Sequence, residues 1–160
     1  MNRREFIAGL GGAAAWPLAA SAQQRAMPVI GYLSSRTADS EVPMLASFRR
    51  GLGDVGYTEG RNVEIEYRFT DGRYDRLSAQ LTDLTQRKVG VIVLTGSGLT
   101  EGLLQQVRAS PIPIVLITGS DLVRLGLVAS MNQPGGNVTG VSSFVGELSG
   151  KRLGLRRLPR

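Results

Sequence analysis

The sequence contains no cysteine and no histidine. Without cysteine there is neither a disulfide framework nor a thiolate nucleophile, and without histidine there is no imidazole general base. The two absences together exclude the His and Cys ligand sets of zinc sites, so we expect no metal centre. An enzyme built on this chain would have to use carboxylates, Lys, Tyr, hydroxyl groups or a cofactor.

The body of the chain has no excess of positive or negative charge. The net charge is +6, but residues 1–22 carry one net positive charge and residues 151–160 carry five, which leaves residues 23–150 neutral. A nucleic-acid-binding domain concentrates Lys and Arg on its folded surface. We therefore expect no nucleic-acid partner.

Residues 1–22 have the pattern of an export signal. Arg3 and Arg4 form a basic start, a short apolar stretch rich in Gly and Ala follows, and Ala20-Ser21-Ala22 matches an A-x-A cleavage site. The apolar stretch is too short for a good membrane span. The adjacent arginines indicate the twin-arginine route, with the Sec route as the alternative. We expect cleavage near Ala22 and a bacterial periplasmic location.

From residue 28 onward, strand and helix patterns alternate. Apolar runs predict strands at 28–33, 91–94, 114–117 and 138–141, and alternation of apolar with charged residues predicts an edge strand at 63–68. Apolar residues at helical spacing predict three helices. The first is capped by Ser40, buries Leu45, Phe48, Leu52 and Val55, and ends at Gly56; the second buries Tyr74, Leu77, Leu81 and Leu84; the third covers 100–109. This order predicts an α/β fold with a doubly wound parallel sheet and strand order 2-1-3-4-5.

Small polar residues follow three of the expected strands: Ser34-Ser35, Thr95-Gly96-Ser97 and Thr118-Gly119. Open parallel sheets bind ligands at the carboxyl ends of their strands. Hydroxyl groups and backbone N–H groups at helix N-termini suit a carboxylate or another small anion. We expect these residues to bind a small solute; the alternative is that Gly and Ser simply make tight loops.

Three other motifs are weaker. Gly96-Ser97-Gly98, with Asp121 downstream, resembles a dinucleotide fingerprint, but its third glycine would fall on Glu101 and its loop follows the third strand, so we expect no cofactor. Gly146 to Lys151 has the wrong spacing for a phosphate loop. Glu64 and Glu66 could form a catalytic carboxylate pair, but a solvated sheet edge explains them better.

Three stretches together resemble bacterial periplasmic substrate-binding proteins of ABC transporters, in the family that includes tryptophan- and tyrosine-type components. They are residues 3–12 with 22–24, the spaced motif of residues 48–63 with Tyr67 and 72–75, and Gly-Leu-Val-Ala-Ser-Met-Asn-Gln-Pro-Gly-Gly-Asn-Val-Thr-Gly at 126–140. The resemblance implies a type I binding fold in which two α/β lobes hold a ligand, with an inner-membrane permease as partner. It places ligand loops of the first lobe at Ser34-Ser35, Thr95-Gly96 and Thr118-Gly119.

The resemblance also divides the chain. Residues 1–22 are expected to be the signal peptide, 23–145 the ligand-binding lobe, and 146–160 a basic amphipathic helix left from the crossover to a second lobe. Because family members are about twice as long, we expect a truncated chain without the second lobe, which could self-associate through its exposed cleft face. Solute binding without catalysis is the leading hypothesis. The alternatives are a nonfunctional fragment and a periplasmic enzyme that uses Asp121 with Ser or Thr.

Overall fold

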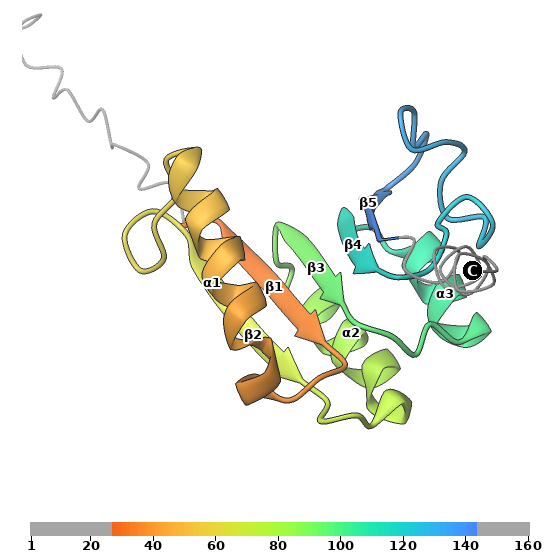
Figure 1. Cartoon of the computed structure of the whole chain (residues 1–160), viewed down its shortest axis with the longest axis horizontal. Coiled ribbons are helices and arrows are strands. Elements are labelled where there is room, and N and C mark those ends of the chain that lie inside the picture. The colour runs from red at the N-terminus through yellow and green to blue at the C-terminus, as the bar shows by residue number, and fades with distance from the viewer. Residues whose placement is uncertain (1–26, 144–160) are drawn as a thin grey trace, which may run out of the picture.

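A computed structural model describes residues 27–143 as one parallel sheet with helices on both faces (Figure 1). The strand order is β2-β1-β3-β4-β5, which confirms the expected doubly wound fold. The expected signal peptide at 1–22 and basic helix at 146–160 lie outside the described residues. In chain order the elements are β1 (Val29–Ser34), α1 (Ala38–Asp54), β2 (Glu64–Phe69), the short 3-10 helix η1 (Tyr74–Arg76), α2 (Leu77–Gln86), β3 (Val91–Thr95), α3 (Glu101–Ala109), β4 (Ile114–Thr118) and β5 (Val138–Ser142).

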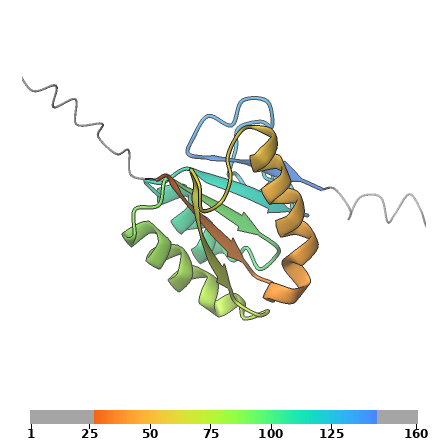
Figure 2. The same cartoon turned by 90° about the vertical axis from the view of Figure 1, so that its left-hand side faces the viewer.

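The two faces of the sheet are covered unequally. Figure 2 shows α1 on one side of the sheet and α2 with α3 on the other. The larger core lies under α2 and α3, where strand residues such as Ile92, Ile114 and Leu116 are fully buried. The smaller core, under α1, includes Tyr32 and Leu45. Complete burial of one Leu or Ile contributes about 1.5–3 kcal/mol, so the larger core stabilises most of the fold.

The first helix begins earlier than the sequence predicted. Thr37 is its N-cap, because the Thr37 side chain accepts a hydrogen bond from the backbone N–H of Ser40. The expectation that Ser40 caps the helix is therefore wrong: Ser40 lies in the first turn, and its Oγ donates to the carbonyl oxygen of Thr37. Gly56 does end the helix region, with φ at +88°. Val55, expected on the buried face, follows the end of α1 and is 69% exposed.

Tyr74 does not belong to the buried face of the second helix. It lies in η1, before α2 begins at Leu77, and its side chain is 47% exposed. Its hydroxyl lies 3.2 Å from Ser97 Oγ in the loop after β3. The expected burial of Leu77, Leu81 and Leu84 is confirmed.

The edge strand β2 is tied to α2 by charged side chains. Arg68 Nη2 lies 3.0 Å from Asp83 Oδ2 of α2 and 2.9 Å from Glu66 Oε2. The hydrogen bond from Arg68 lowers the pKa of Asp83, and the nearby charge of Arg87 lowers it further. Glu66 also pairs with Arg87, so this carboxylate belongs to an ion network at the sheet edge. No helix within residues 27–143 is long and apolar enough to cross a lipid bilayer.

Candidate functional site

The carboxyl ends of β1, β3 and β4 meet at one edge of the sheet. Ser34 is paired in register with Thr95, and Thr95 with Ile117. The loops that follow are tied to each other, because the N–H of Ser35 donates to the Thr95 carbonyl and the N–H of Gly96 to the Ile117 carbonyl, both at 3.2 Å. The structure thus brings together the three segments that the sequence placed at this edge.

Several of the hydroxyl groups in these segments are engaged within the protein. Ser35 Oγ accepts a hydrogen bond of 3.0 Å from the N–H of Ser97, and Thr118 Oγ1 accepts one of 3.2 Å from the N–H of Ser120. Ser34 Oγ accepts from the N–H of Arg36 at 3.1 Å. These side chains fix the conformation of the loops. We expected these hydroxyl groups to face a solute. Some of them instead shape the loops, so we distinguish these residues from the residues that line the site.

A hollow of about 100 Å³ lies at this edge. Four of the expected site residues line it: Thr95, Gly96, Thr118 and Gly119. Ser34 and Ser35 are not among its lining residues, and Ser97 is exposed beside Tyr74. Five other lining residues were not among those predicted from the sequence: Arg36, Glu41, Met44, Ile117 and Ser143.

Glu41 is the most unusual residue of this site. It lies in the first turn of α1 and is 1% exposed. One carboxylate oxygen, Oε1, accepts hydrogen bonds from Ser34 Oγ at 2.5 Å and from Thr95 Oγ1 at 2.7 Å. The other oxygen, Oε2, is buried and has no hydrogen-bond partner among residues 27–143. A buried carboxylate oxygen without a donor is costly, which makes this atom a candidate contact for a ligand.

Tyr32 lies behind Glu41 in the smaller core. Burial raises the pKa of Tyr32, and the negative charge of Glu41 raises it further, while a contact with Thr95 acts in the opposite direction. The ring packs against Phe48 and Tyr67 with centroids 5.4 and 5.9 Å away. Its hydroxyl is buried and also has no hydrogen-bond partner in the described part of the chain.

Gly96 allows the loops that follow β1 and β3 to approach each other at the site. Its φ is +100°, outside the range that other residues adopt easily. A Cβ at this position would collide with Ser35 Oγ, the atom that receives the Ser97 N–H. The shape of the loop therefore accounts for glycine at this position, without the dinucleotide fingerprint that Gly96-Ser97-Gly98 resembles.

Asp121 is used within its own loop. Its Oδ1 accepts hydrogen bonds from the N–H groups of Val123 at 2.9 Å and Arg124 at 3.2 Å. It is absent from the lining of the hollow that contains Thr95 and Thr118. Across residues 27–143, no group of three or more His, Cys, Asp or Glu side chains could hold a metal ion.

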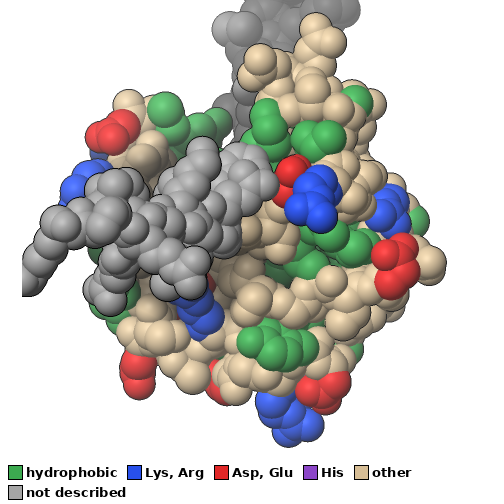
Figure 3. Space-filling model, turned by 45° about the vertical axis from the view of Figure 1, so that its right-hand side comes forward, with side chains coloured by type: hydrophobic (Ala, Val, Ile, Leu, Met, Phe, Trp, Pro, Cys, Tyr) green, Lys and Arg blue, Asp and Glu red, His purple; other side chains and the backbone are tan. Residues whose placement is uncertain are grey.

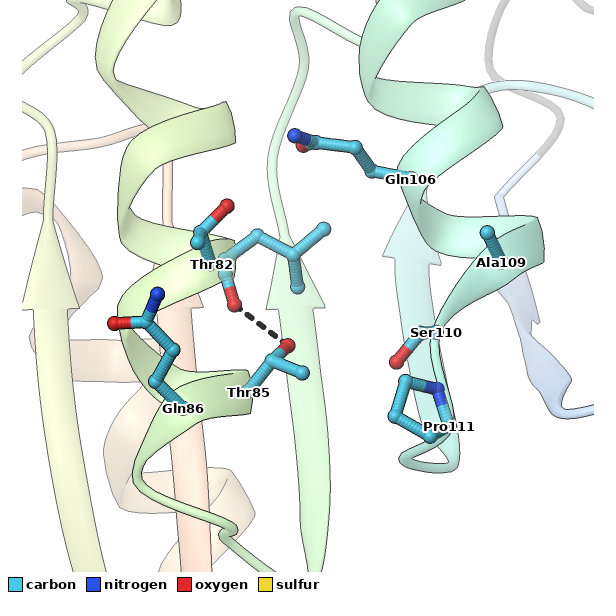
Figure 4. Close-up of a pocket in the computed structure, with 8 residues that line it drawn as sticks. Thr82, Thr85, Gln86, Gln106, Ala109, Ser110 and Pro111 are labelled. Atoms are coloured by element: carbon cyan, nitrogen blue, oxygen red, sulfur yellow. Dashed lines mark hydrogen bonds between the residues drawn. The ribbon is translucent and has the colours of Figure 1, made fainter.

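A second hollow, of about 220 Å³, lies between α2 and α3 (Figure 4). Thr82 and Thr85 border it from α2, Gln106 from α3, and Pro111 from the segment before β4. The Thr85 hydroxyl is turned back to the Leu81 carbonyl at 2.8 Å. Because α2 and α3 end here, ahead of β3 and β4, this hollow lies toward the amino ends of the strands, away from the residues predicted from the sequence.

Charged side chains are dispersed on the described surface. On the face shown in Figure 3, Lys and Arg side chains alternate with Asp and Glu side chains. This distribution agrees with the neutral charge of residues 23–150.

Comparison with known proteins gives a family match over most of the chain. The family model described as "ABC transporter substrate binding protein" matches residues 29–149. A curated relative, the tyrosine-binding protein of Clostridioides difficile, is 26% identical over 98 residues. That alignment covers 61% of this chain and 28% of the relative, so this chain spans less than a third of that protein.

Solved structures share the fold. A conserved domain protein from Vibrio cholerae has a TM-score of 0.68 at 24% identity, over 84% of this chain and 45% of that chain. The ligand-free, open structure of a substrate binding protein with adhesive properties from Clostridium difficile has a TM-score of 0.64, also at 24% identity, over 79% of this chain and 42% of that chain. Both comparisons therefore match this chain to less than half of a longer protein.

Proposed function

Because the chain belongs to the family of ABC transporter substrate-binding proteins, we propose that it binds a small organic solute at the carboxyl edge of its sheet. The solute is an amino acid or an aromatic carboxylate. The tyrosine-binding relative supports this class, and its name supplies a first probe, L-tyrosine. The residues proposed for binding are Ser34, Ser35, Thr95, Gly96, Ser97, Thr118 and Gly119, with the first two acting mainly through loop shape.

One observation carries this proposal. Three strand ends converge on a hollow lined by Thr95, Gly96, Thr118 and Gly119, and open parallel sheets of this kind generally bind ligands at this edge. The hollow, at about 100 Å³, is smaller than the 300–1,000 Å³ typical of complete ligand pockets. It therefore fits one end of a solute. The resemblance implies a second lobe in longer family members, and this lobe would cover the other end of the solute.

The test is a titration with a blocked variant. Gly119 lines the hollow, and a Cβ there would lie 3.7 Å from its nearest neighbour, the carbonyl oxygen of Ser143, so the first carbon added by Gly119→Val meets no backbone clash and the branched side chain adds bulk at the site. We expect L-tyrosine, other amino acids or small carboxylates, added at millimolar concentration, to shift the backbone NMR signals of residues 95–97 and 118–120. The Gly119→Val variant should lose these shifts.

Gly136→Val is the matched control. Gly136 is also an exposed loop glycine with open space around it, but it precedes β5 at the opposite end of the sheet. This variant should bind like the unmodified chain. Solute-induced shifts confined to Thr82, Thr85 and Gln106 would instead assign binding to the hollow between α2 and α3 and overturn the proposed site.

The remaining parts of the proposal concern location and partners. Residues 1–22 would direct export to the periplasm, and an ABC permease in the inner membrane would receive the solute. Self-association through the cleft face stays a prediction from the sequence. A catalytic role has less support, because the matched family is one of transport proteins and the carboxylate of Asp121 is held within its own turn.

A further inference from the structure

The second carboxylate oxygen of Glu41 indicates which chemical group the site recognises. Burying a carboxylate costs several kcal/mol unless its oxygens receive hydrogen bonds or an opposite charge. Ser34 and Thr95 satisfy Oε1, whereas Oε2 has no donor within residues 27–143. No Lys or Arg among these residues forms an ion pair with Glu41. A group that brings both a positive charge and N–H donors would satisfy this oxygen.

The position of Glu41 directs that group to the proposed site. Glu41 lines the same hollow as Thr95, Gly96 and Gly119. Met44, one turn further along α1, shares this lining and has the flexible thioether side chain that can move to admit a ligand atom. Glu41 is thus a lining residue of the hollow although its side chain is buried.

Arg36 supplies the opposite charge at the rim. It is exposed, lines the hollow and makes no ion pair with the other described residues. Arginine binds carboxylates in a planar, bidentate geometry. The hollow is therefore bordered by a buried carboxylate, Glu41, and an exposed guanidinium, Arg36. This pair is complementary to a solute head group that carries an ammonium and a carboxylate.

We infer that Glu41 is a specificity-determining residue that accepts the protonated amine of the solute through Oε2, while Arg36 faces the solute carboxylate. This inference rests on the proposed function and narrows it: the solute is a zwitterionic amino acid, and an aromatic carboxylate without an amine is rejected. The selectivity has a physical cause: Oε2 is already buried without a donor, and only a solute that carries the amine supplies one.

The experiment compares two probes that differ only in the amine, L-tyrosine and para-hydroxyphenylpropionate, by calorimetry and NMR on the full chain. A hydrogen bond to a charged group corresponds to about a tenfold to hundredfold change in affinity. We expect L-tyrosine to bind at least tenfold more tightly than its analogue. Glu41→Gln keeps an acceptor for Ser34 and Thr95 but removes the charge, and should weaken L-tyrosine tenfold or more without weakening the analogue.

Asp39→Asn is the matched control. Asp39 lies two residues away in the same turn of α1, is exposed and does not line the hollow. It tests for a general effect of removing a negative charge from this turn, and we expect unchanged affinity for L-tyrosine. Arg36→Gln should weaken L-tyrosine but not tyramine, which has the amine and lacks the carboxylate.

The outcomes separate this inference from the proposed function. Equal binding of L-tyrosine and its analogue, with shifts at residues 95–97, would overturn the role of Glu41 and leave solute binding in place. Unchanged L-tyrosine affinity in a folded Glu41→Gln variant would do the same. If neither probe nor any other amino acid or small carboxylate binds, both conclusions fail. If Glu41→Gln does not fold, the comparison of the two probes on the unmodified chain decides.

Discussion

Gly96 shows how one residue controls the site. It follows the last residue of β3, has φ at +100°, and lies so close to Ser35 Oγ that a Cβ here would force Ser35 to shift. Ser35 Oγ in turn holds the N–H of Ser97. The positions of two loops therefore depend on the absence of a single side chain.

We predict that Gly96→Ala destabilises the protein by about 1–3 kcal/mol, because alanine in this backbone region is strained and its methyl group collides with Ser35. Gly51→Ala is the matched control, since Gly51 lies inside α1 with open space around it. That change should stabilise by about 0.5–1 kcal/mol, as expected for glycine replaced inside a helix. Urea unfolding of both variants measures the difference, and equal effects would contradict the role given to Gly96.

At the same scale, the sequence predicted the site only in part. The residues at the strand ends followed from the strand pattern, so Thr95 and Thr118 could be placed at one edge. Glu41 was missed, although a signal was present: it lies four residues before Leu45, on the helical stripe that continues through Phe48 and Leu52. A carboxylate on an apolar stripe is unusual, but only the three-dimensional structure shows that Ser34 and Thr95 donate to it.

Among the elements, α1 depends on a cap that brings Glu41 into position. Thr37 lies between Arg36 and the first turn, and its Oγ1 accepts the N–H of Ser40 at 3.3 Å. We predict that Thr37→Ala lowers the free energy of unfolding by about 1 kcal/mol, because it removes this N-cap. Thr37→Ser keeps the hydroxyl and should stay close to the unmodified chain in thermal unfolding. A full loss in both variants would show that the threonine methyl group, and not the cap, stabilises the turn.

A second prediction at the level of elements concerns the link between β2 and α2. The pKa of Asp83 is lowered chiefly by the hydrogen bond from Arg68, so ionised Asp83 favours the folded state. This stabilisation is present above the ordinary carboxyl pKa, near 4, and is lost as the pH falls through the lowered value. Asp83→Asn should therefore lower the stability above about pH 4 by an amount that does not vary with pH, and reduce the dependence of stability on pH below about pH 4.

Unfolding curves collected from pH 2 to pH 7 measure this effect, with Asp75→Asn as the control. Asp75 pairs with Arg73 at 3.5 Å, but both side chains are largely exposed and the pair joins no two elements. An identical acid dependence in the unmodified chain and in Asp83→Asn would show that the ion network does not stabilise the edge strand.

The sequence predicted the elements better than their ends. Runs without polar residues identified β3 and β4, since only strands buried on both faces tolerate such runs. The start of α1 was misplaced because both Thr37 and Ser40 are good N-cap residues, and the sequence alone does not show which hydroxyl receives the N–H. Tyr74 was assigned to α2 because its spacing from Leu77 and Leu81 is helical, whereas the chain forms the separate turn η1 there.

For the whole molecule, the strand order followed from two properties of the sequence. The second strand alternates apolar with charged residues, which places it at an edge, and the alternation of strands with helices requires parallel neighbours. The order β2-β1-β3-β4-β5 agrees. The segment at residues 1–22 is different, because its predicted role in export depends on cellular machinery and not on packing within this sheet.

Export is therefore tested in cells. Changing Arg3 and Arg4 together to Lys should retain the uncleaved precursor in the cytoplasm if residues 1–22 direct the twin-arginine route. Immunoblotting of cell fractions measures the precursor and the form cleaved near Ala22. Normal export of the double variant would leave the Sec route as the explanation.

The central place of β1 also affects biosynthesis. β1 is the first strand to leave the ribosome, but it lies between β2 and β3 and gains its second neighbour only when Thr95 has been made. At translation rates of about 5–20 residues per second, the interval between the synthesis of Ser34 and that of Thr95 lasts roughly 3–12 seconds. Until α2 is complete at Gln86, Leu33 of β1, which belongs to the larger core, has no helix on its face of the sheet to pack against. Once β3 is paired, β4 and β5 join in the order of synthesis, so the nascent sheet grows from then on in one direction only.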